Sequence, residues 1–486
     1  MNRKLYIIQT MMIVLLLSVA GHVVGRSITV SSASAINKTW SAGDTLILPN
    51  GNYSNLVLTI QGNGTASQPI VLRAATPGMV FLGGNSYITL KGKYIELNGI
   101  RFQGTYSGKN HIIQFDSSSS NCRATECGIE SYNPTDETKD WKWVSLKGSQ
   151  NRVDHCYFVG KGHMGTLLVV WLESGIIPKH RIDHNYFGTR EALVDDEGKA
   201  LNGQEIIRIG DSSTSMQEAQ CIVENNYFEH CDGEIEMISN KSCGNIYRYN
   251  TVFACAGTLT FRHGNGCTAE SNYFFGEGVN ASGGVRIIGE NHTVKNNYFQ
   301  DLTGNNFRAG VSIVRGKPNS ALNEYYQVKN ATVTNNIFVN CKEAFCVNYH
   351  SSSECNLLAL NSTITNNTVY NDDAHKSYRI VTQAASGGSI SWNGNIYNAG
   401  KFSDYTASSP AWTKQSSLAR PAAPTDIPSA ENSGPAWLHP TLPTDEIEVQ
   451  KSKVQATKML ENGQVVILIG DKKYSILGNN IGNRKL

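Results

Sequence analysis

Charged residues of both signs gather within a short stretch in the middle of the chain. Glu234 and Glu236 are two positions apart, and Lys241, Arg262 and Arg286 follow them. Two carboxylates at positions i and i+2 can hold a hard cation such as Ca²⁺, which binds several oxygen ligands. Positive side chains beside them would attract an acidic substrate. The combination predicts a site where a metal ion and an acidic substrate meet.

This combination suits β-elimination in a uronic-acid polysaccharide. A base removes the proton beside the sugar carboxylate, and the glycosidic oxygen leaves from the adjacent carbon. A bound cation neutralises the carboxylate and stabilises the developing negative charge. We expect Lys241 to be the base, because neighbouring positive charge favours the neutral amine that a base requires. Arg262 is expected to donate toward the leaving oxygen, with a bridging water or a tyrosine as the alternative donor.

The elements that must position these residues recur along the chain. An asparagine, usually followed by an aromatic pair, returns at short intervals, and the copies lie at Asn185, Asn226, Asn250, Asn272, Asn297, Asn336 and Asn367. Short β-branched strands precede these copies, and helical periodicity is nearly absent between residues 90 and 400. Asparagine tolerates left-handed corners and can stack into hydrogen-bonded columns. These features predict an all-β fold, a single-domain right-handed parallel β-helix.

The repeat also places the charged residues relative to one another. Alternation along a strand would direct Glu234 and Glu236 to one outer face. Lys241, Arg262 and Arg286 follow their own asparagines at similar distances. We therefore expect them to form a ladder on three successive coils, about 4.8 Å apart.

A third metal ligand is expected upstream of the two glutamates. Asn202 precedes Glu234 by one coil and an inserted loop, so its amide oxygen is a candidate. The alternative is a surface cluster of salt bridges, which commonly decorates exposed strands. The alignment of three cations on successive coils favours the functional interpretation.

The eleven cysteines do not follow a metal-binding pattern. Cys221, Cys243 and Cys267 recur at about the coil spacing, so we expect small apolar residues stacked inside the solenoid. Disulfides between coils are the alternative in an oxidising compartment. A zinc site is disfavoured, because the pairs lack the close spacing of zinc ligands.

The chain begins with a basic, then apolar, then small-residue pattern that is typical of a secretory signal peptide over residues 1–25. We expect an exported protein, whether periplasmic, outer-surface or secreted, with no transmembrane domain. The β-helix is expected over 26–400, a proline-rich irregular wrap over 401–450, and a small β-meander tail over 451–486. Asn462-Gly463 between apolar runs is a hairpin signal in that tail.

The balance of charge limits the partners. The chain carries 42 Lys and Arg against 40 Asp and Glu, and removal of the signal segment would remove Arg3 and Lys4. The remaining chain is then formally neutral, so affinity for a polyanion must be local. We do not expect a nucleic-acid partner.

The residues around the site resemble polysaccharide lyase family 6, which includes alginate lyases and chondroitinase B. The resemblance runs from about Ser27 to Tyr397 and is most specific from Asp232 to Ser242 and at Arg262-His263-Gly264. It implies a parallel β-helix and calcium-assisted elimination. The implied roles are a base at Lys241, an acid at Arg262, calcium ligands at Asn202, Glu234 and Glu236, and substrate contacts at Arg286 and His263.

The segment from Lys317 to Tyr326 resembles the alginate lyases more than chondroitinase B. We therefore expect an exported alginate lyase that produces unsaturated oligosaccharides. One alternative is a chondroitinase B-type lyase acting on dermatan or chondroitin sulfate, with sulfate contacts from Arg308 and Arg315. Another is a non-catalytic carbohydrate-binding β-helix with structural calcium. Mannuronate or guluronate preference, endo or exo action and oligomeric state stay open.

Lys161 and His163 are the last candidates near the cleft. They can be interpreted as cleft residues or as part of a solvated loop, and the loop is favoured.

Overall fold

The computed structural model describes residues 25–383, 388–403 and 412–439, together with four strands between residues 456 and 483. The chain divides into two compact units, residues 1–438 and 439–486. The expected signal peptide, apart from Gly25, lies outside the described residues. The four-residue α2 (Ala33–Ile36) is the one α-helix of the described residues, and none of their helices has the length and apolarity for crossing a membrane.

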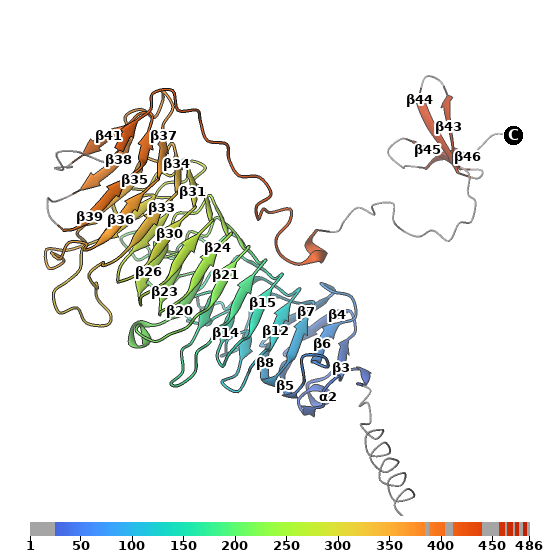
Figure 1. Ribbon diagram of the computed structural model, residues 1–486. Helices are drawn as coiled ribbons and strands as arrows, with labels where there is room; N and C mark the ends of the chain where they lie inside the picture. The colour runs from blue at the N-terminus through green and yellow to red at the C-terminus, as the bar shows by residue number, and fades with distance from the viewer. Residues whose placement is uncertain are drawn as a thin grey trace, which may run out of the picture. The chain divides into compact units, whose positions relative to one another are not determined.

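The first unit is a right-handed parallel β-helix built from three sheets of 14 strands each, which confirms the predicted fold (Figure 1). Sheet A runs from β1 (Ser27–Thr29) to β39 (Ile390–Asn393), and sheet C runs from β4 (Gly51–Ser54) to β42 (Trp412–Lys414). Sheet B carries the candidate site. Its strands are β2 (Thr39–Trp40), β5 (Val57–Asn63), β8 (Tyr87–Lys93), β11 (Ile113–Phe115), β14 (Val144–Leu146), β17 (Leu168–Val170), β20 (Ile207–Gly210), β23 (Ile238–Lys241), β26 (Leu259–His263), β29 (Val285–Ile287), β32 (Val311–Val314), β35 (Glu343–Tyr349), β38 (Arg379–Gln383) and β41 (Lys401–Ser403).

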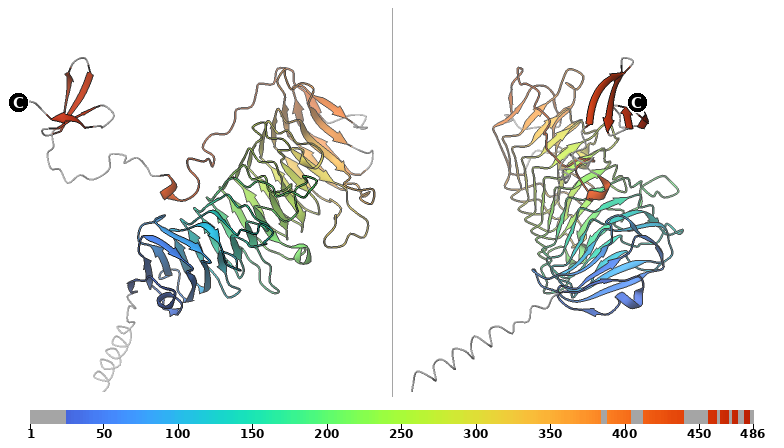
Figure 2. Two further views of the ribbon diagram at one scale, coloured as in Figure 1. Left: turned by 180° about the vertical axis from the view of Figure 1, so that it is seen from behind. Right: turned by 90° about the vertical axis from the view of Figure 1, so that its right-hand side faces the viewer.

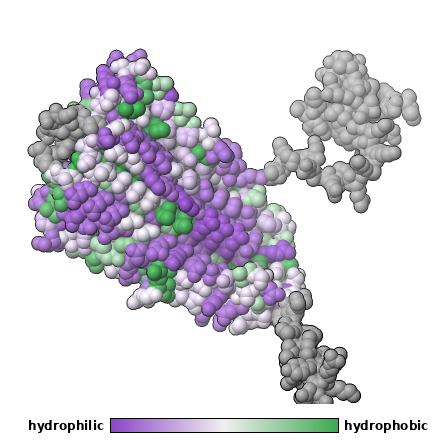
Figure 3. Space-filling model, viewed as in Figure 1, coloured by the Kyte–Doolittle hydropathy of each residue, from purple (hydrophilic) through white to green (hydrophobic). Residues whose placement is uncertain are grey.

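One continuous apolar core fills the inside of the coils. Each strand turns alternate side chains inward, so equivalent residues of successive coils stack. Phe158, Phe187 and Phe228 form such a stack, with ring centroids 5.4 and 4.9 Å apart. All eleven cysteines are buried as free thiols, in keeping with the packing role expected for them. Hydrophilic side chains cover most of the outer face shown in Figure 3.

A column of buried asparagines runs along the solenoid and joins the coils. In each of seven successive pairs from Asn185 to Asn395, the backbone N–H and side-chain Nδ2 of one asparagine both donate to Oδ1 of the next. These distances are 2.9 to 3.1 Å. The column that the repeat predicted is therefore confirmed.

The left-handed corner falls one residue earlier than the repeat predicted. The residue before each column asparagine has a positive φ, for example 54° at Asn225 and 58° at Asn296. The corner is occupied by His184 and Tyr249 in other coils. The column asparagine is thus kept for its hydrogen bonds, whereas the position before it tolerates several residue types.

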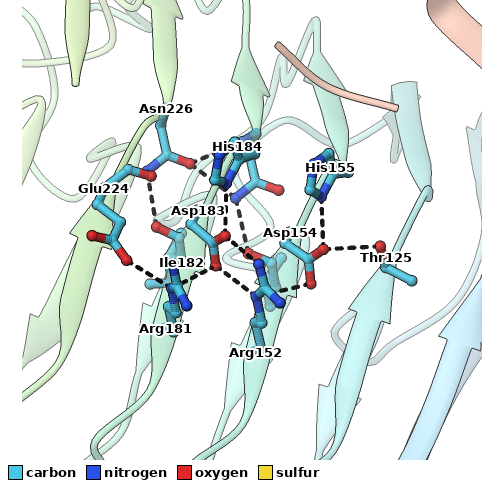
Figure 4. A network of polar contacts seen from close by, with 12 residues as sticks. Thr125, Arg152, Asp154, His155, Arg181, Ile182, Asp183, His184, Glu224 and Asn226 are labelled. Carbon is cyan, nitrogen blue, oxygen red and sulfur yellow. Dashed lines mark hydrogen bonds and ion pairs between the residues drawn. The ribbon is translucent and has the colours of Figure 1, made fainter. Parts of the chain in front are cut away.

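A second ladder, of alternating charges, lies on sheet A (Figure 4). Asp154 at the end of β15 (Arg152–Asp154) accepts hydrogen bonds from Arg123 Nε at 2.7 Å, Thr125 Oγ1 at 3.0 Å and His155 Nδ1 at 2.8 Å. Burial raises the pKa of the Asp154 carboxyl, but the hydrogen bonds from Arg123 and His155 outweigh it and hold the pKa below its usual range. The next coils repeat the arrangement.

In the coil after Asp154, Asp183 at the end of β18 (Arg181–Asp183) binds Arg152 Nε at 2.8 Å and His184 Nδ1 at 2.8 Å. Arg181 in turn lies 2.7 Å from Glu224 Oε1 at the end of β21 (Ile222–Glu224). The charges of sheet A therefore neutralise one another, and this face has little net charge to offer a polyanion.

The chain continues past the end that the sequence predicted for the β-helix. β41 and β42 still pair with sheets B and C, so the last coil extends beyond residue 400. Residues 415–438 then run back along the outside of the coils (Figures 1 and 2). Trp437 anchors this C-terminal strap by donating from Nε1 to the Glu126 carbonyl at 2.7 Å.

The second unit is a four-stranded antiparallel sheet. Its strands are β43 (Ala456–Glu461), β44 (Gln464–Ile469), β45 (Lys472–Ser475) and β46 (Asn480–Asn483). Neighbouring strands along the chain pair with one another.

Replacing a column asparagine is expected to destabilise the β-helix. Asn250→Ala removes a side chain that donates to Asn272 and Val223 and accepts twice from Asn226. Buried groups lose their partners, so we expect a loss of about 3 kcal/mol in unfolding free energy. Urea unfolding measures it. Asn52→Ala, at an exposed strand position, is the matched control. Equal stability of the two variants would show that the column is dispensable.

The Asp154 carboxylate is expected to stabilise the fold in a pH-dependent way. Because its folded pKa is depressed, its contribution is present above the ordinary aspartate pKa and is lost as the pH falls toward the folded value. Asp154→Asn should therefore cost about 3 kcal/mol at pH 7, and the deficit should shrink toward pH 3. Unfolding of both proteins at the two pH values, with the exposed Asp373→Asn as control, measures it. A deficit that does not change with pH would contradict this origin.

Candidate active site

Two buried glutamates lie just before β23. The strand begins at Ile238, so the strand alternation expected for Glu234 and Glu236 does not apply to them. Glu234 is 6% exposed, and its Oε2 accepts the backbone N–H groups of Gly203 at 2.6 Å and Gln204 at 3.1 Å. Glu236 is 8% exposed and accepts from Ser239 Oγ at 2.6 Å. Both carboxylates are therefore held by neighbouring backbone and hydroxyl groups.

The three cations do not stand in one register, which corrects the expected ladder. β29 places Arg286 opposite Thr260 of β26. Lys241 pairs with His263, because a bulge at this point leaves Arg262 without a partner in β23. Arg286 is thus level with Thr260 and Ser239, which lie two residues before Arg262 and Lys241 on their strands. Sequence spacing could not show the bulge.

The side chains of Arg262 and Arg286 nevertheless meet at one carboxylate. Glu236 Oε1 lies 3.3 Å from Arg262 Nε and 3.5 Å from Arg286 Nη1. All three side chains are largely shielded, with 15%, 5% and 11% of the Arg262, Arg286 and Glu236 side chains exposed. Two guanidinium groups therefore pair with the Glu236 carboxylate. Guanidinium groups form strong, charge-assisted hydrogen bonds with carboxylates.

Lys241 lies beside a third glutamate that the sequence interpretation assigned no role. Its Nζ is 3.6 Å from Glu205 Oε1, and Glu205 Oε2 accepts from Thr166 Oγ1 at 2.7 Å. β20 and β23 pair from their first residues onward, and Glu205 and Glu236 each precede that pairing by two positions. The two glutamates therefore stack on adjacent coils. An alignment of strand starts, rather than of asparagines, would have revealed Glu205.

The three carboxylates are held together at an electrostatic cost. Burial, and then the charges of Glu205 and Glu236, raise the pKa of Glu234 to about 7. Burial also raises the pKa of Glu205, but Lys241 and Arg208 outweigh this effect and lower it. A cluster of buried carboxylates that resists full ionisation favours an added positive charge.

The oxygen donors at the site fit a hard cation, but the side chains do not complete its coordination by themselves. Among the described residues, no group of three His, Cys, Asp or Glu side chains is arranged to hold a metal by itself. Ca²⁺ also accepts amide, backbone and solvent oxygens, so two or three carboxylates with such partners are sufficient. Asn202 is exposed and adjoins Gly203, whose N–H binds Glu234. Glu234, Glu236 and Asn202, with Glu205 beside them, are thus the residues that could hold Ca²⁺.

His263 is buried behind the cations rather than displayed to solvent. It is 2% exposed, and its Nε2 lies 3.3 Å from Ser212 Oγ. Burial, and then the charges of Arg262 and Lys241, lower the pKa of His263 to about 3. The ring is therefore neutral near pH 7, and its Nδ1 has no hydrogen-bond partner in the described structure.

A loop from a later coil covers the site. Arg262 Nη1 donates to the Glu324 carbonyl at 2.7 Å and Nη2 to the Asn323 carbonyl at 3.3 Å. The Arg262 guanidinium also lies 4.5 Å from the centroid of the Tyr325 ring. This loop belongs to the segment from Lys317 to Tyr326, so the part of the sequence that distinguished the alginate lyases lies directly over the catalytic face.

Tyr325 joins the two arginines. Arg286 Nη2 donates to the Tyr325 hydroxyl at 3.3 Å, and Phe307 lies 5.2 Å from the same guanidinium. The sequence interpretation left a tyrosine open as an alternative proton donor without choosing one. The structure brings the Tyr325 hydroxyl to the cationic cluster.

Lys161 and His163 are not in a solvated loop, which corrects that interpretation. They are 2% and 1% exposed, and Lys161 Nζ donates to the carbonyls of His163 and Met164, both at 2.8 Å. Burial lowers the pKa of Lys161 well below its usual value. Their polar atoms are used to close a loop, so repetition alone could not have placed them.

Comparisons with known proteins agree on a family. The sequence model of the chondroitinase B family matches residues 29–423. The solved PL6 family alginate lyase AlyGC is 34% identical, with a TM-score of 0.71 over 78% of this chain and 54% of AlyGC. The chain thus spans little more than half the length of AlyGC. A comparison with curated proteins finds no match.

Two further solved structures match over most of their own length. A mannuronic acid specific family 6 lyase from human gut microbiota is 30% identical, with a TM-score of 0.65 over 78% of this chain and 86% of that one. The PL6 polysaccharide lyase Pedsa3628 from Pseudopedobacter saltans is 25% identical, with a TM-score of 0.68 over 84% and 99%. The chain belongs to polysaccharide lyase family 6, and within that family it is closer to the alginate lyases than to chondroitinase B.

Proposed function

We propose that this protein cleaves alginate by calcium-assisted β-elimination and releases unsaturated oligosaccharides. The proposal is carried by the convergence of Arg262 and Arg286 on the Glu236 carboxylate. Lys241 lies on the strand that neighbours Arg262. Such a cluster suits a chain that bears a carboxylate on every sugar. Two relatives of at least 30% identity are an alginate lyase and a mannuronic acid specific lyase, and they favour alginate over sulfated substrates.

The roles follow from the position of each group. Neutral Lys241 would take the proton from the carbon that bears the carboxylate. The electron pair of that C–H bond forms the new carbon–carbon double bond as the glycosidic C–O bond breaks, and the leaving oxygen receives a proton. Arg286 would orient the substrate carboxylate, and Arg262 would donate the proton to the leaving oxygen, directly or through a bridging water. The Tyr325 hydroxyl, already bound by Arg286, is the alternative proton donor.

Calcium would be held by Glu234, Glu236 and Asn202, with Glu205 beside them. When bound, it would supply positive charge that neutralises the substrate carboxylate and stabilises the dianion formed on proton removal. Lys241 is paired with Glu205. Its work as a base therefore requires that the negative charge of Glu205 be offset.

Replacement of Lys241 is expected to abolish turnover without unfolding the chain. Wild-type protein incubated with alginate should show rising ultraviolet absorbance from the new double bond. Lys241→Ala should lower the rate by about 10³-fold or more, because the base is removed. Lys295→Ala, on sheet A, is the matched control.

The same assay separates the alternatives. Dermatan and chondroitin sulfates are assayed in parallel, and a rise on these alone would move the function to a chondroitinase B-type lyase. No rise on any polymer, in a folded and calcium-supplied protein, would favour a non-catalytic carbohydrate-binding β-helix. A Lys241→Ala rate near that of wild type would refute the proposed base.

Calcium is expected to bind the glutamate cluster. Chelation should lower turnover, and added Ca²⁺ should restore it and raise the melting temperature, because the ion relieves repulsion between the buried carboxylates. Glu234→Gln/Glu236→Gln should lose the shift in melting temperature. Glu290→Gln, whose carboxylate pairs with Lys329 away from the site, should keep it. If neither the turnover rate nor the melting temperature changed on chelation or on addition of Ca²⁺, the proposed calcium site would be wrong.

A further inference from the structure

A hollow on the outer face of sheet B lies toward the N-terminus from the candidate active site. Its volume is about 510 Å³. The floor is formed by Gln114 of β11 and Ser145 of β14, and the walls include Trp141, Trp171 and Lys147. The catalytic roles assigned above use none of these residues. We call this hollow the Trp141–Trp171 pocket.

The pocket and the active site share one row of outward positions on sheet B. Strand pairing carries the row from Gln114 through Ser145, Val169 and Arg208 to Ser239, which binds Glu236. β14 and β23 are three strands apart in this order, or roughly 14 Å at the usual strand spacing. In Figure 1, β8, β14, β20 and β23 follow one another along the solenoid. A polymer lying along this face would cross both places.

Arg208 physically links the two places. Its guanidinium lies 5.4 Å from the centroid of the Trp171 ring, and it lowers the pKa of Glu205 in the active site. Trp171 is fixed in turn, because its Nε1 donates to Ser145 Oγ at 3.0 Å. Arg208 therefore connects the aromatic wall of the pocket with the glutamates of the candidate active site.

The chemistry of the pocket matches a chain of acidic sugars. Trp141 and Trp171 are half-buried, so each offers an apolar ring surface to the C–H face of a pyranose. Lys109 and Lys147 add positive charge for sugar carboxylates. Two carboxylates, Asp116 and Glu173, also line the pocket and balance the formal charge of the lysines. Asp116 accepts from Ser118 N–H at 3.0 Å and Glu173 from Gly148 N–H at 3.0 Å, so the lysines serve as local contacts for sugar carboxylates rather than as a net positive field.

His111, which also lines the pocket, adds no charge to it near pH 7. Burial, and then the charge of Lys142, lower the pKa of His111 to about 4. The ring is therefore neutral near pH 7, and it meets Trp141 edge-on with centroids 6.4 Å apart.

We propose that the Trp141–Trp171 pocket is a distal subsite that binds non-reacting uronate residues of the polysaccharide, several strands from the bond that is cleaved. The inference rests on the proposed function, because it assumes a polyuronate substrate. Binding energy from remote sugars improves the use of long chains over short ones. The enzyme should therefore favour long substrates, and the pocket should be the source of that preference.

The test compares substrate lengths in variants of the full chain. Trp141→Ala and Lys147→Ala should each lower kcat/KM on polymeric alginate by about ten-fold more than on the shortest oligomer that is cleaved. Tyr249→Ala, at an exposed ring, and Lys414→Ala, at an exposed position of β42 on sheet C, remove an aromatic ring and a lysine away from the pocket and are the matched controls. Equal losses on long and short substrates, or no loss on either, would overturn the subsite.

Direct binding keeps this test separate from that of the proposed function. Calorimetry with long oligouronates and Lys241→Ala protein does not need turnover. Adding Lys147→Ala to that variant should weaken binding about ten-fold, since a charge-assisted contact is lost. Unchanged binding would reject the subsite even in an active lyase. Weakened binding would retain it even if wild-type protein formed no unsaturated product.

Discussion

The hydrogen bonds that join successive coils through buried asparagines, from Asn185 to Asn395, are the constraint on which the part of the structure that carries the candidate site depends. A parallel solenoid has no hairpins to fix the register of its strands, and slippage by one residue would turn every inward side chain outward. Each column asparagine binds both the backbone N–H and the side chain of its neighbour, as Asn226 does with Asn250. Register is therefore set at one corner of each coil from Asn185 to Asn395. Loops of different length can enter at the other corners without disturbing it.

That rigidity allows the candidate active site to hold like charges close together. Three buried carboxylates lie just before β20 and β23, and three cations lie on β23, β26 and β29 of sheet B. Burial and the charges of Glu205 and Glu236 raise the pKa of Glu234 and favour its neutral form. A flexible scaffold would relax by exposing these groups to water. Here strand pairing fixes them, so in the proposed function the repulsion would be relieved by binding, with a cation at the carboxylates and an acidic sugar at the arginines. Sheet A shows the opposite solution, because its buried carboxylates Asp154, Asp183 and Glu224 are each paired with an arginine.

The sequence was sufficient to predict the fold and to place the three cations on one sheet, because both depend on repetition. The asparagine spacing indicated a β-helix, and Lys241, Arg262 and Arg286 did prove to lie on one sheet. Their exact partners could not be predicted, since the bulge at Arg262 shifts the pairing by one residue. Glu205 was missed because a long insertion hid its alignment with Glu236. Lys161 and His163 were misplaced because hydrogen bonds to loop carbonyls, which carry no repeat, bury them.

Long insertions are where this solenoid acquires a particular chemistry. The coils themselves supply rows of outward positions that continue from one strand to the next, as the row from Gln114 to Ser239 does. Such rows are generic, and they suit any extended polymer. Selectivity enters through loops that close over a row, such as the one that places Tyr325 between Arg262 and Arg286. The regular scaffold sets the spacing of the outward side chains, and the irregular loops decide which substrate they accept. This explains why the residues of the candidate active site resemble the whole family, whereas the segment over it distinguishes the branches of the family.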